Sequence, residues 1–189
     1  LDYLEDILVF TREETGEYPY FECEQLSALC NTRSINYHFT GSVLGEDSIK
    51  TIEQFSPSMV LVVTFHAKLG KRIITSVNNE AVNVHPSLLP FYRGPTPTNW
   101  AIINDEKETG ITYHKLTNDF DRGPILLRKK IAIESFFTDG TLRYQLGKLI
   151  ERTIPEFLDK YRYGKITPAH QEQNSGSYFP NINSNEALE

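Results

Sequence analysis

The stretch AVNVHPSLLPFYRGPTPTNW, residues Ala81–Trp100, joins a short apolar strand to a proline-rich segment. Side chains alternate across a strand, so Asn83 and His85 are expected on one face and the neighbouring valines on the other. Proline cannot donate the backbone hydrogen bonds of helix or sheet, so a stiff, irregular loop without either is predicted after His85. Its prolines are Pro86, Pro90, Pro95 and Pro97. A stiff loop at a strand end is a common place for a functional site.

Outside this stretch, short apolar runs bounded by turn residues alternate with amphipathic stretches. This pattern predicts an α/β fold with a mostly parallel sheet flanked by helices. Strands are expected at Ile7–Phe10, Ile35–Phe39, Met59–Phe65, Ala81–His85, Gly110–Leu116 and Pro124–Ile133. Helices are expected around Glu22–Asn31, at Ser48–Phe55 and at Asp139–Gly164, the last with a kink near Pro155. We expect one folded domain over residues 1–165, and a polar tail over residues 166–189 that packs on it or trails from it.

The composition suits a globular domain that needs neither metal nor disulfides for stability. The chain has 189 residues, of which 39% are hydrophobic, enough for a sizeable core. Cys23 and Cys30 lack a metal-ligand spacing and are interpreted as buried, reduced thiols. No apolar run approaches the roughly 18 residues of a membrane span and no basic-then-apolar leader is apparent, so we expect a cytoplasmic protein without a membrane partner.

Charge and motifs exclude further classes of function. The formal net charge of −6 is spread along the chain, which disfavours nucleic acid as a partner. No G-x-G-x-x-G and no G-x-x-x-x-G-K-[ST] occurs in the sequence. Neither a dinucleotide site nor a P-loop is therefore indicated.

Asn83, His85 and Asp121 are the candidate chemical groups. His85 ends its strand, and ligands of open α/β sheets bind outside the carboxyl ends of the strands. Asp121, in the turn FDRG before another strand, offers a carboxylate that could hold an imidazole in one tautomer or stabilise its protonated form. Two plainer interpretations compete. His85 could be a hydrogen-bonded core histidine, and Asp121 only a turn former.

The segment NVHPSLLPFYRG, Asn83–Gly94, closely resembles the signature of the 10-formyltetrahydrofolate-dependent formyltransferases. Asp121, 38 residues after Asn83, falls where that family carries its acidic catalytic residue. The resemblance implies a Rossmann-like formyltransferase fold, 10-formyltetrahydrofolate as formyl donor, and Asn83, His85 and Asp121 as the catalytic trio. It also implies folate contacts from Phe65, Leu69, Ser87, Leu88, Leu89, Pro90, His114, Leu116 and Phe120. The family's usual first strand is not apparent before DYLEDILVF, and we expect it to be missing.

The chemistry of formyl transfer accounts for these residue types. Moving a formyl group from a folate nitrogen to an amine passes through a tetrahedral intermediate whose oxyanion needs fixed hydrogen-bond donors. The Asn83 carboxamide would supply one donor. His85 would add a second donor or carry the proton of the attacking amine, and Asp121 would hold His85 or an intervening water in place.

The resemblance is closest to the sugar-nucleotide N-formyltransferases, which implies transfer to the amino group of a nucleotide-linked amino sugar. The glycinamide-ribonucleotide branch fits poorly, because its glycine-rich phosphate loop is not apparent in the sequence. The methionyl-tRNA branch normally carries a C-terminal barrel that helps to hold tRNA, whereas this chain is acidic and ends soon after PAHQEQNSGSYFPNI. The catalytic domain of a methionyl-tRNA formyltransferase is the alternative. A homodimer and the identity of the acceptor sugar are left open.

Two interpretations from other classes compete with an amine formyltransferase. A metal-dependent hydrolase would use His66, His85, His114 and Asp121 as ligands. The tight spacings of metal motifs are absent, and the family resemblance uses no metal. A formyltransferase-like module that binds folate without turnover would keep the same residues.

Overall fold

The computed structural model describes residues 6–11, 25–41, 45–65, 69–78, 80–172 and 174–182. The chain divides into two compact units. The first consists of Leu1–Pro57 with His66–Leu69, and the second of Ser58–Phe65 with Gly70–Glu189. The residues after 165 thus group with the second unit, and the domain boundary expected there stays a prediction.

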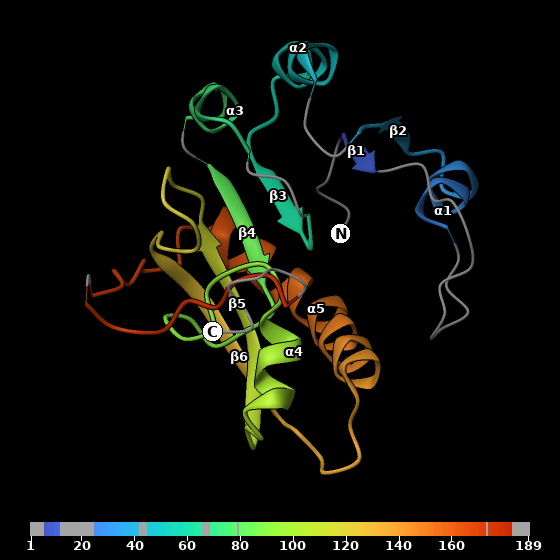
Figure 1. Ribbon diagram of the computed structural model, residues 1–189. Coiled ribbons are helices and arrows are strands. Elements are labelled where there is room, and N and C mark those ends of the chain that lie inside the picture. The colour runs from blue at the N-terminus through green and yellow to red at the C-terminus, as the bar shows by residue number, and fades with distance from the viewer. Residues whose placement is uncertain are drawn as a thin grey trace. The chain divides into compact units, whose positions relative to one another are not determined.

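Within its described residues, the first unit contains a pair of parallel strands and two helices (Figure 1). In chain order its elements are β1 (Leu8–Thr11), α1 (Leu26–Thr32), β2 (Asn36–Phe39) and α2 (Glu46–Phe55). β1 and β2 are in register with Leu8 opposite Asn36. All four elements were predicted within a few residues, although the predicted start of the first helix, Glu22, lies outside the described residues. Cys30 is a buried free thiol, as expected, and Cys23 also lies outside the described residues.

The second unit is built on a four-stranded sheet in the order β3-β4-β5-β6. The strands are β3 (Val60–Val63), β4 (Ala81–His85), β5 (Glu108–Lys115) and β6 (Ile125–Ala132). The predicted α/β class is confirmed, and β3 and β4 are parallel, but β5 and β6 each run antiparallel to the preceding strand. Residues 116–124 between β5 and β6 are too few for the crossover that a parallel pair requires.

In the described part of the second unit, three helices accompany this sheet: α3 (Lys71–Ser76), α4 (Pro97–Ile103) and α5 (Asp139–Arg162). The prediction that the prolines exclude helix is wrong at Pro97, which occupies the first turn of α4. The N–H that proline lacks has no partner in the first turn of any helix, so proline is tolerated there. α3 was not predicted either. α5 was predicted, and it continues through Pro155.

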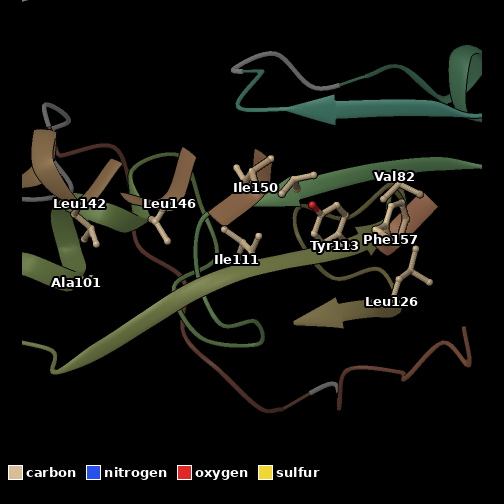
Figure 2. Packing of buried hydrophobic residues seen from close by; sticks show 10 residues of the cluster. Val82, Ala101, Ile111, Tyr113, Leu126, Leu142, Leu146, Ile150 and Phe157 are labelled. Atoms are coloured by element: carbon tan, nitrogen blue, oxygen red, sulfur yellow. The ribbon is translucent and has the colours of Figure 1, made fainter. Parts of the chain in front are cut away.

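The apolar core lies between one face of the sheet and α5 (Figure 2). Val82 and Val84 of β4 belong to this core, together with Tyr113 of β5 and the fully buried Phe157 of α5. The rings of Tyr113 and Phe157 stack with their centroids 4.4 Å apart. Because side chains alternate along β4, burying its valines in this core turns Asn83 and His85 toward the opposite face.

Candidate active site

The proline-rich loop that follows β4, residues 86–96, is hydrogen-bonded to the two antiparallel strands. The Thr112 hydroxyl on β5 donates to the Ser87 carbonyl over 2.6 Å and accepts from the Leu89 N–H over 3.1 Å. Arg128 on β6 donates from Nη1 to the Leu89 carbonyl over 3.0 Å. These bonds satisfy the Ser87 carbonyl and both backbone polar groups of Leu89, and they attach the loop to the sheet beside the end of β4.

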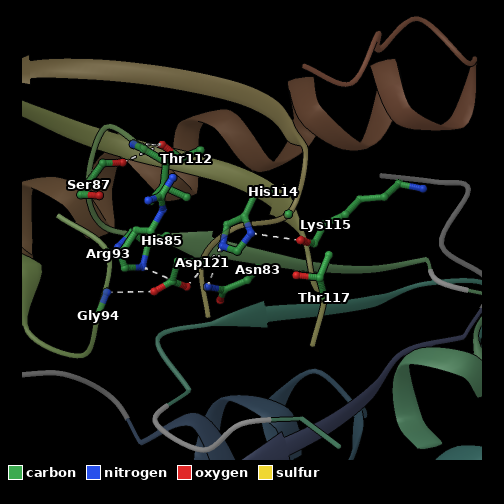
Figure 3. Close-up of polar contacts among 12 residues, drawn as sticks. Asn83, His85, Ser87, Arg93, Gly94, Thr112, His114, Lys115, Thr117 and Asp121 are labelled. Atoms are coloured by element: carbon green, nitrogen blue, oxygen red, sulfur yellow. Dashed lines mark hydrogen bonds and ion pairs between the residues drawn. The ribbon is translucent and has the colours of Figure 1, made fainter. Parts of the chain in front are cut away.

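Asn83 faces His114 across the β4–β5 ladder (Figure 3). Its Nδ2 lies 3.2 Å from His114 Nε2, and His114 Nδ1 lies 3.1 Å from the Lys115 carbonyl oxygen. A carbonyl oxygen can only accept, so Nδ1 carries the proton of the neutral His114 ring and Nε2 accepts from Asn83. His114, which is 1% exposed, thereby fixes the plane of the Asn83 carboxamide.

His85 is buried between the loop and Asp121. Its Nε2 lies 2.8 Å from the Tyr92 carbonyl oxygen, which places the proton of the neutral ring on Nε2. Its Nδ1 faces Asp121 Oδ1 at 3.7 Å, too far for a direct hydrogen bond. Burial lowers the pKa of His85 below the ordinary value, against the charge of Asp121 and the Tyr92 carbonyl, which both raise it.

Asp121 lies in the turn between β5 and β6 and has a positive φ of 52°. Its Oδ2 accepts the Gly94 N–H over 3.0 Å, and its Oδ1 lies 3.6 Å from His114 Nε2. Burial raises the pKa of this carboxyl, but the nearby His114 and His85 rings and the Gly94 N–H outweigh it and bring the pKa to about 2. Asp121 is therefore ionised near neutral pH.

The structure thus brings Asn83, His85 and Asp121 together with His114, one of the residues expected to contact folate. Two others, Ser87 and Leu89, are buried by protein atoms. Leu88, Pro90, Leu116 and Phe65 are partly exposed, and Phe120, next to Asp121, is 58% exposed. Leu69 is buried and belongs to the first unit. Folate contact by each of these residues stays a prediction.

Sequence reasoning missed three residues that shape the site: Tyr92, Arg93 and Gln171. Tyr92 acts through its carbonyl group. Gln171 donates from Nε2 to the Asp121 and Gly123 carbonyls, each over 2.8 Å, and its Oε1 accepts from the buried Arg93. A cavity of about 540 Å³ is lined by Arg93, Asp119, Arg122, Gln171, Glu172 and Asn174. No motif marked Gln171, because it lies in a polar segment with no periodicity.

A metal centre finds no support among the described residues, where no group of three His, Cys, Asp or Glu side chains is placed to hold a metal ion. His66, one of the ligands considered for such a centre, lies outside those residues. Within the same described ranges, none of the helices is long and apolar enough to cross a membrane.

Comparison with known proteins identifies relatives of the chain. A family profile described as "Formyl transferase" matches residues 12–158. The methionyl-tRNA formyltransferase of Caldanaerobacter subterraneus subsp. tengcongensis is 38% identical over 134 residues, covering 71% of this chain and 43% of that protein. The methionyl-tRNA formyltransferase of Thermotoga maritima is 31% identical over 141 residues, covering 75% and 45%. The chain spans less than half the length of either relative.

Solved structures share the fold. The formyltransferase PseJ from Anoxybacillus kamchatkensis, in complex with UDP-4,6-dideoxy-4-formamido-L-AltNAc and tetrahydrofolate, matches with a TM-score of 0.71 and 20% identity, covering 97% of this chain and 89% of that one. Phosphoribosylglycinamide formyltransferase from Bacillus halodurans matches with a TM-score of 0.68 and 21% identity, covering 82% and 79%. The predicted Rossmann-like formyltransferase fold is confirmed by these matches.

Proposed function

The chain belongs to the formyl transferase family, and on that premise we propose that it transfers the formyl group of 10-formyltetrahydrofolate to a primary amine. The observation that carries the proposal is the clustering of Asn83, His85, His114 and Asp121 at the end of β4, within a chain whose residues 12–158 match the family. The cluster contains an amide N–H donor, a neutral imidazole and an ionised carboxylate. In formyl transfer, the donor can stabilise the oxyanion, the imidazole can carry the proton, and the carboxylate can stabilise the imidazolium.

Asn83 is the proposed oxyanion donor. A carboxamide carries two N–H bonds, and His114 Nε2 accepts one of them. The second donates to the oxygen of the formyl group as negative charge develops on it during attack by the amine. Because His114 fixes the plane of the amide, this donor is aligned before the reaction starts.

His85 and Asp121 are the proposed proton-transfer pair. A new bond forms between the amine nitrogen and the formyl carbon, and the bond from that carbon to the folate nitrogen breaks. The amine must lose a proton and the departing nitrogen must gain one. His85 Nδ1, which carries no proton in the neutral ring, accepts it and later returns it. The carboxylate of Asp121, 3.7 Å away, stabilises the imidazolium formed in between.

The amino group of a nucleotide-linked amino sugar is the proposed acceptor. The solved complex of PseJ, whose fold this chain shares, contains a UDP-linked formamido sugar. The net charge of −6 of this chain also opposes binding to the phosphates of tRNA. Methionyl-tRNA is the second candidate, because relatives more than 30% identical in sequence are methionyl-tRNA formyltransferases.

A transfer assay tests both levels of the proposal. The protein is incubated with 10-formyltetrahydrofolate and, separately, with UDP- and dTDP-linked amino sugars and with methionyl-tRNA, and the mass gain of one formyl group is measured. Formylation of an amino sugar is expected, and formylation of methionyl-tRNA alone would replace the proposed acceptor. A thermal shift with folate and no transfer to any acceptor would indicate a folate-binding module instead.

A further inference from the structure

Tyr92 connects His85 to the C-terminal part of the chain. Its carbonyl oxygen accepts the Nε2 proton of His85 over 2.8 Å. Its φ of +59° lies in the left-handed region, which is disfavoured for a residue with a side chain and persists only where the surroundings enforce it. The contacts that hold Tyr92 therefore also set the position of the acceptor for the His85 proton.

Two of these contacts come from the segment of residues 177–180, here called the C-terminal segment. The Tyr92 N–H donates to the Ser177 hydroxyl over 2.9 Å. The Tyr92 ring stacks on Phe179 with a centroid separation of 5.0 Å. At the tip of the Tyr92 ring, the hydroxyl donates to Glu106 and accepts from Asn104 Nδ2. Backbone, ring and hydroxyl of Tyr92 are all engaged.

The C-terminal segment is itself attached to the loop and to α4. The Arg93 N–H donates to the Ser177 carbonyl over 3.0 Å, and the Phe179 N–H donates to the Arg93 carbonyl over 2.9 Å. Phe179 also stacks on Trp100, whose indole N–H donates to the Pro180 carbonyl over 2.9 Å. The approach is so close that a Cβ at Gly94 would lie 2.1 Å from the Phe179 carbonyl oxygen.

We propose that the C-terminal segment is a positioning element of the active site, which acts through Tyr92 to keep the proton of neutral His85 on Nε2 and leave Nδ1 able to accept one. The competing influence is Asp121, whose negative charge beside Nδ1 favours a proton on that atom. The other titratable or charged groups that act on His85 are His114 and Arg93, which both oppose its protonation. Without the Tyr92 carbonyl, the balance between the two ring nitrogens tips toward Nδ1.

The inference rests on the proposed function only for its effect on turnover, because the tautomer of His85 is measured without substrate. The probe is NMR of the protein labelled with ¹⁵N-histidine, with the signals of His85 assigned by comparison with His85→Gln. Wild-type protein is expected to show His85 as the Nε2–H tautomer. A wild-type ring with its proton on Nδ1 would overturn the proposal.

Ser177→Ala removes the acceptor of the Tyr92 N–H and is the main test. The Nδ1–H tautomer of His85 is expected to grow, and the titration midpoint of His85 to move to lower pH, because the Tyr92 carbonyl raises the pKa of His85. The matched control is Ser175→Ala, whose hydroxyl donates to the Glu172 carbonyl and not to Tyr92. Phe179→Leu removes the stacking and is expected to act in the same direction as Ser177→Ala, so it carries the test if Ser177→Ala does not fold.

Turnover of Ser177→Ala is the second measurement that tests the proposal. With an accepted amine, kcat of Ser177→Ala is expected to fall about threefold to tenfold, the range that one neutral hydrogen bond supports, while KM for the folate donor is unchanged. A fall in kcat with an unchanged His85 tautomer in both variants would overturn the proposal. A protein that formylates no acceptor but shows the expected tautomers would overturn the proposed function and leave this inference supported.

Discussion

The hydrogen bond between Asn83 and His114 determines which of their nitrogens can donate to other groups in the site. While His114 Nε2 accepts from Asn83, it cannot donate to Asp121, although the carboxylate oxygen lies only 3.6 Å from it. A proton on His114 Nε2 would let this nitrogen donate to Asp121, and the hydrogen bond from the Asn83 amide would be lost. The neutral ring is therefore the form in which Asn83 is held as a hydrogen-bond donor.

Replacing Asn83 by Ala tests the oxyanion role at the level of one residue. Loss of one such donor is expected to slow kcat by about 10²–10³. The affinity for a folate analogue should change little, because the interaction is made to the developing charge. Single-turnover kinetics and a binding isotherm give the two quantities. An equal loss in both would assign Asn83 a structural role.

A double-mutant cycle on His85 and Asp121 tests whether the two act as one unit. If the carboxylate works by stabilising protonated His85, then His85→Ala, Asp121→Ala and the double variant should lose nearly equal amounts of kcat. Turnover of all three is compared with the same acceptor, at a temperature where each variant is folded. Losses that simply multiply would mean that the groups act independently.

The depressed pKa of Asp121 has a consequence for stability that does not require activity. A carboxyl whose pKa falls from 3.8 to about 2 on folding stabilises the folded state above the ordinary pKa, and this stabilisation disappears as the pH falls toward 2. The shift of nearly two units corresponds to about 2.5 kcal/mol. Urea unfolding is expected to show a stability difference between wild type and Asp121→Asn of at most this amount above pH 4, and the two proteins are expected to converge near pH 2. A difference independent of pH would contradict this origin.

Among the elements, those set by periodicity could be predicted and those set by backbone contacts could not. The bounds of β4 follow from its pattern of apolar and polar residues, AVNVH, and from Pro86, and the spacing of the family motif placed Asp121 beside it. α4 was missed because Pro97 lies at the one turn of a helix that tolerates proline. The direction of β6 leaves no mark on its apolar pattern, but the short connection of residues 116–124 is a signal in the sequence that the prediction of a mostly parallel sheet did not use. Tyr92 acts through a carbonyl group, which every residue has, so nothing in the sequence distinguished it.

The contact between the loop and the C-terminal segment is tested by a pair of glycine substitutions. Gly94 has a φ of +111° and no room for a Cβ beside the Phe179 carbonyl, so Gly94→Ala is expected to destabilise the protein by about 1–3 kcal/mol. Gly147, within α5, has nothing within 4 Å of a built Cβ, so Gly147→Ala is expected to stabilise by about 0.5–1 kcal/mol. Urea unfolding measures both. A Gly94→Ala variant as stable as wild type would show that this contact is not as close as described, whatever the effect of Gly147→Ala.

In the second unit, the sheet separates the core from the candidate site. Val82 and Val84 pack on one side with α5, and Asn83 and His85 lie on the other, so one strand serves both. Packing of the valines against α5 fixes the position of Asn83 and His85. The loop and the C-terminal segment fix which ring nitrogen of His85 carries the proton. Stability and chemistry therefore depend on different faces of β4, and substitutions on the two faces should be separable by experiment.

Phe157 gives the sharpest test of this separation. It is fully buried in the core against Tyr113, and its replacement by Ala is expected to cost about 3–5 kcal/mol, a large part of the roughly 5–15 kcal/mol that stabilises a typical domain. Phe157→Leu is the milder variant if Phe157→Ala does not accumulate. Phe136→Ala, at a residue that is 75% exposed, is the control and should change stability by less than about 0.5 kcal/mol. Because Phe157 lies on the valine side of β4, kcat per folded molecule should be unchanged at a temperature where the variant is folded. If kcat per folded molecule falls at a temperature below the start of the variant's thermal transition, the core and the candidate site are coupled through the strand.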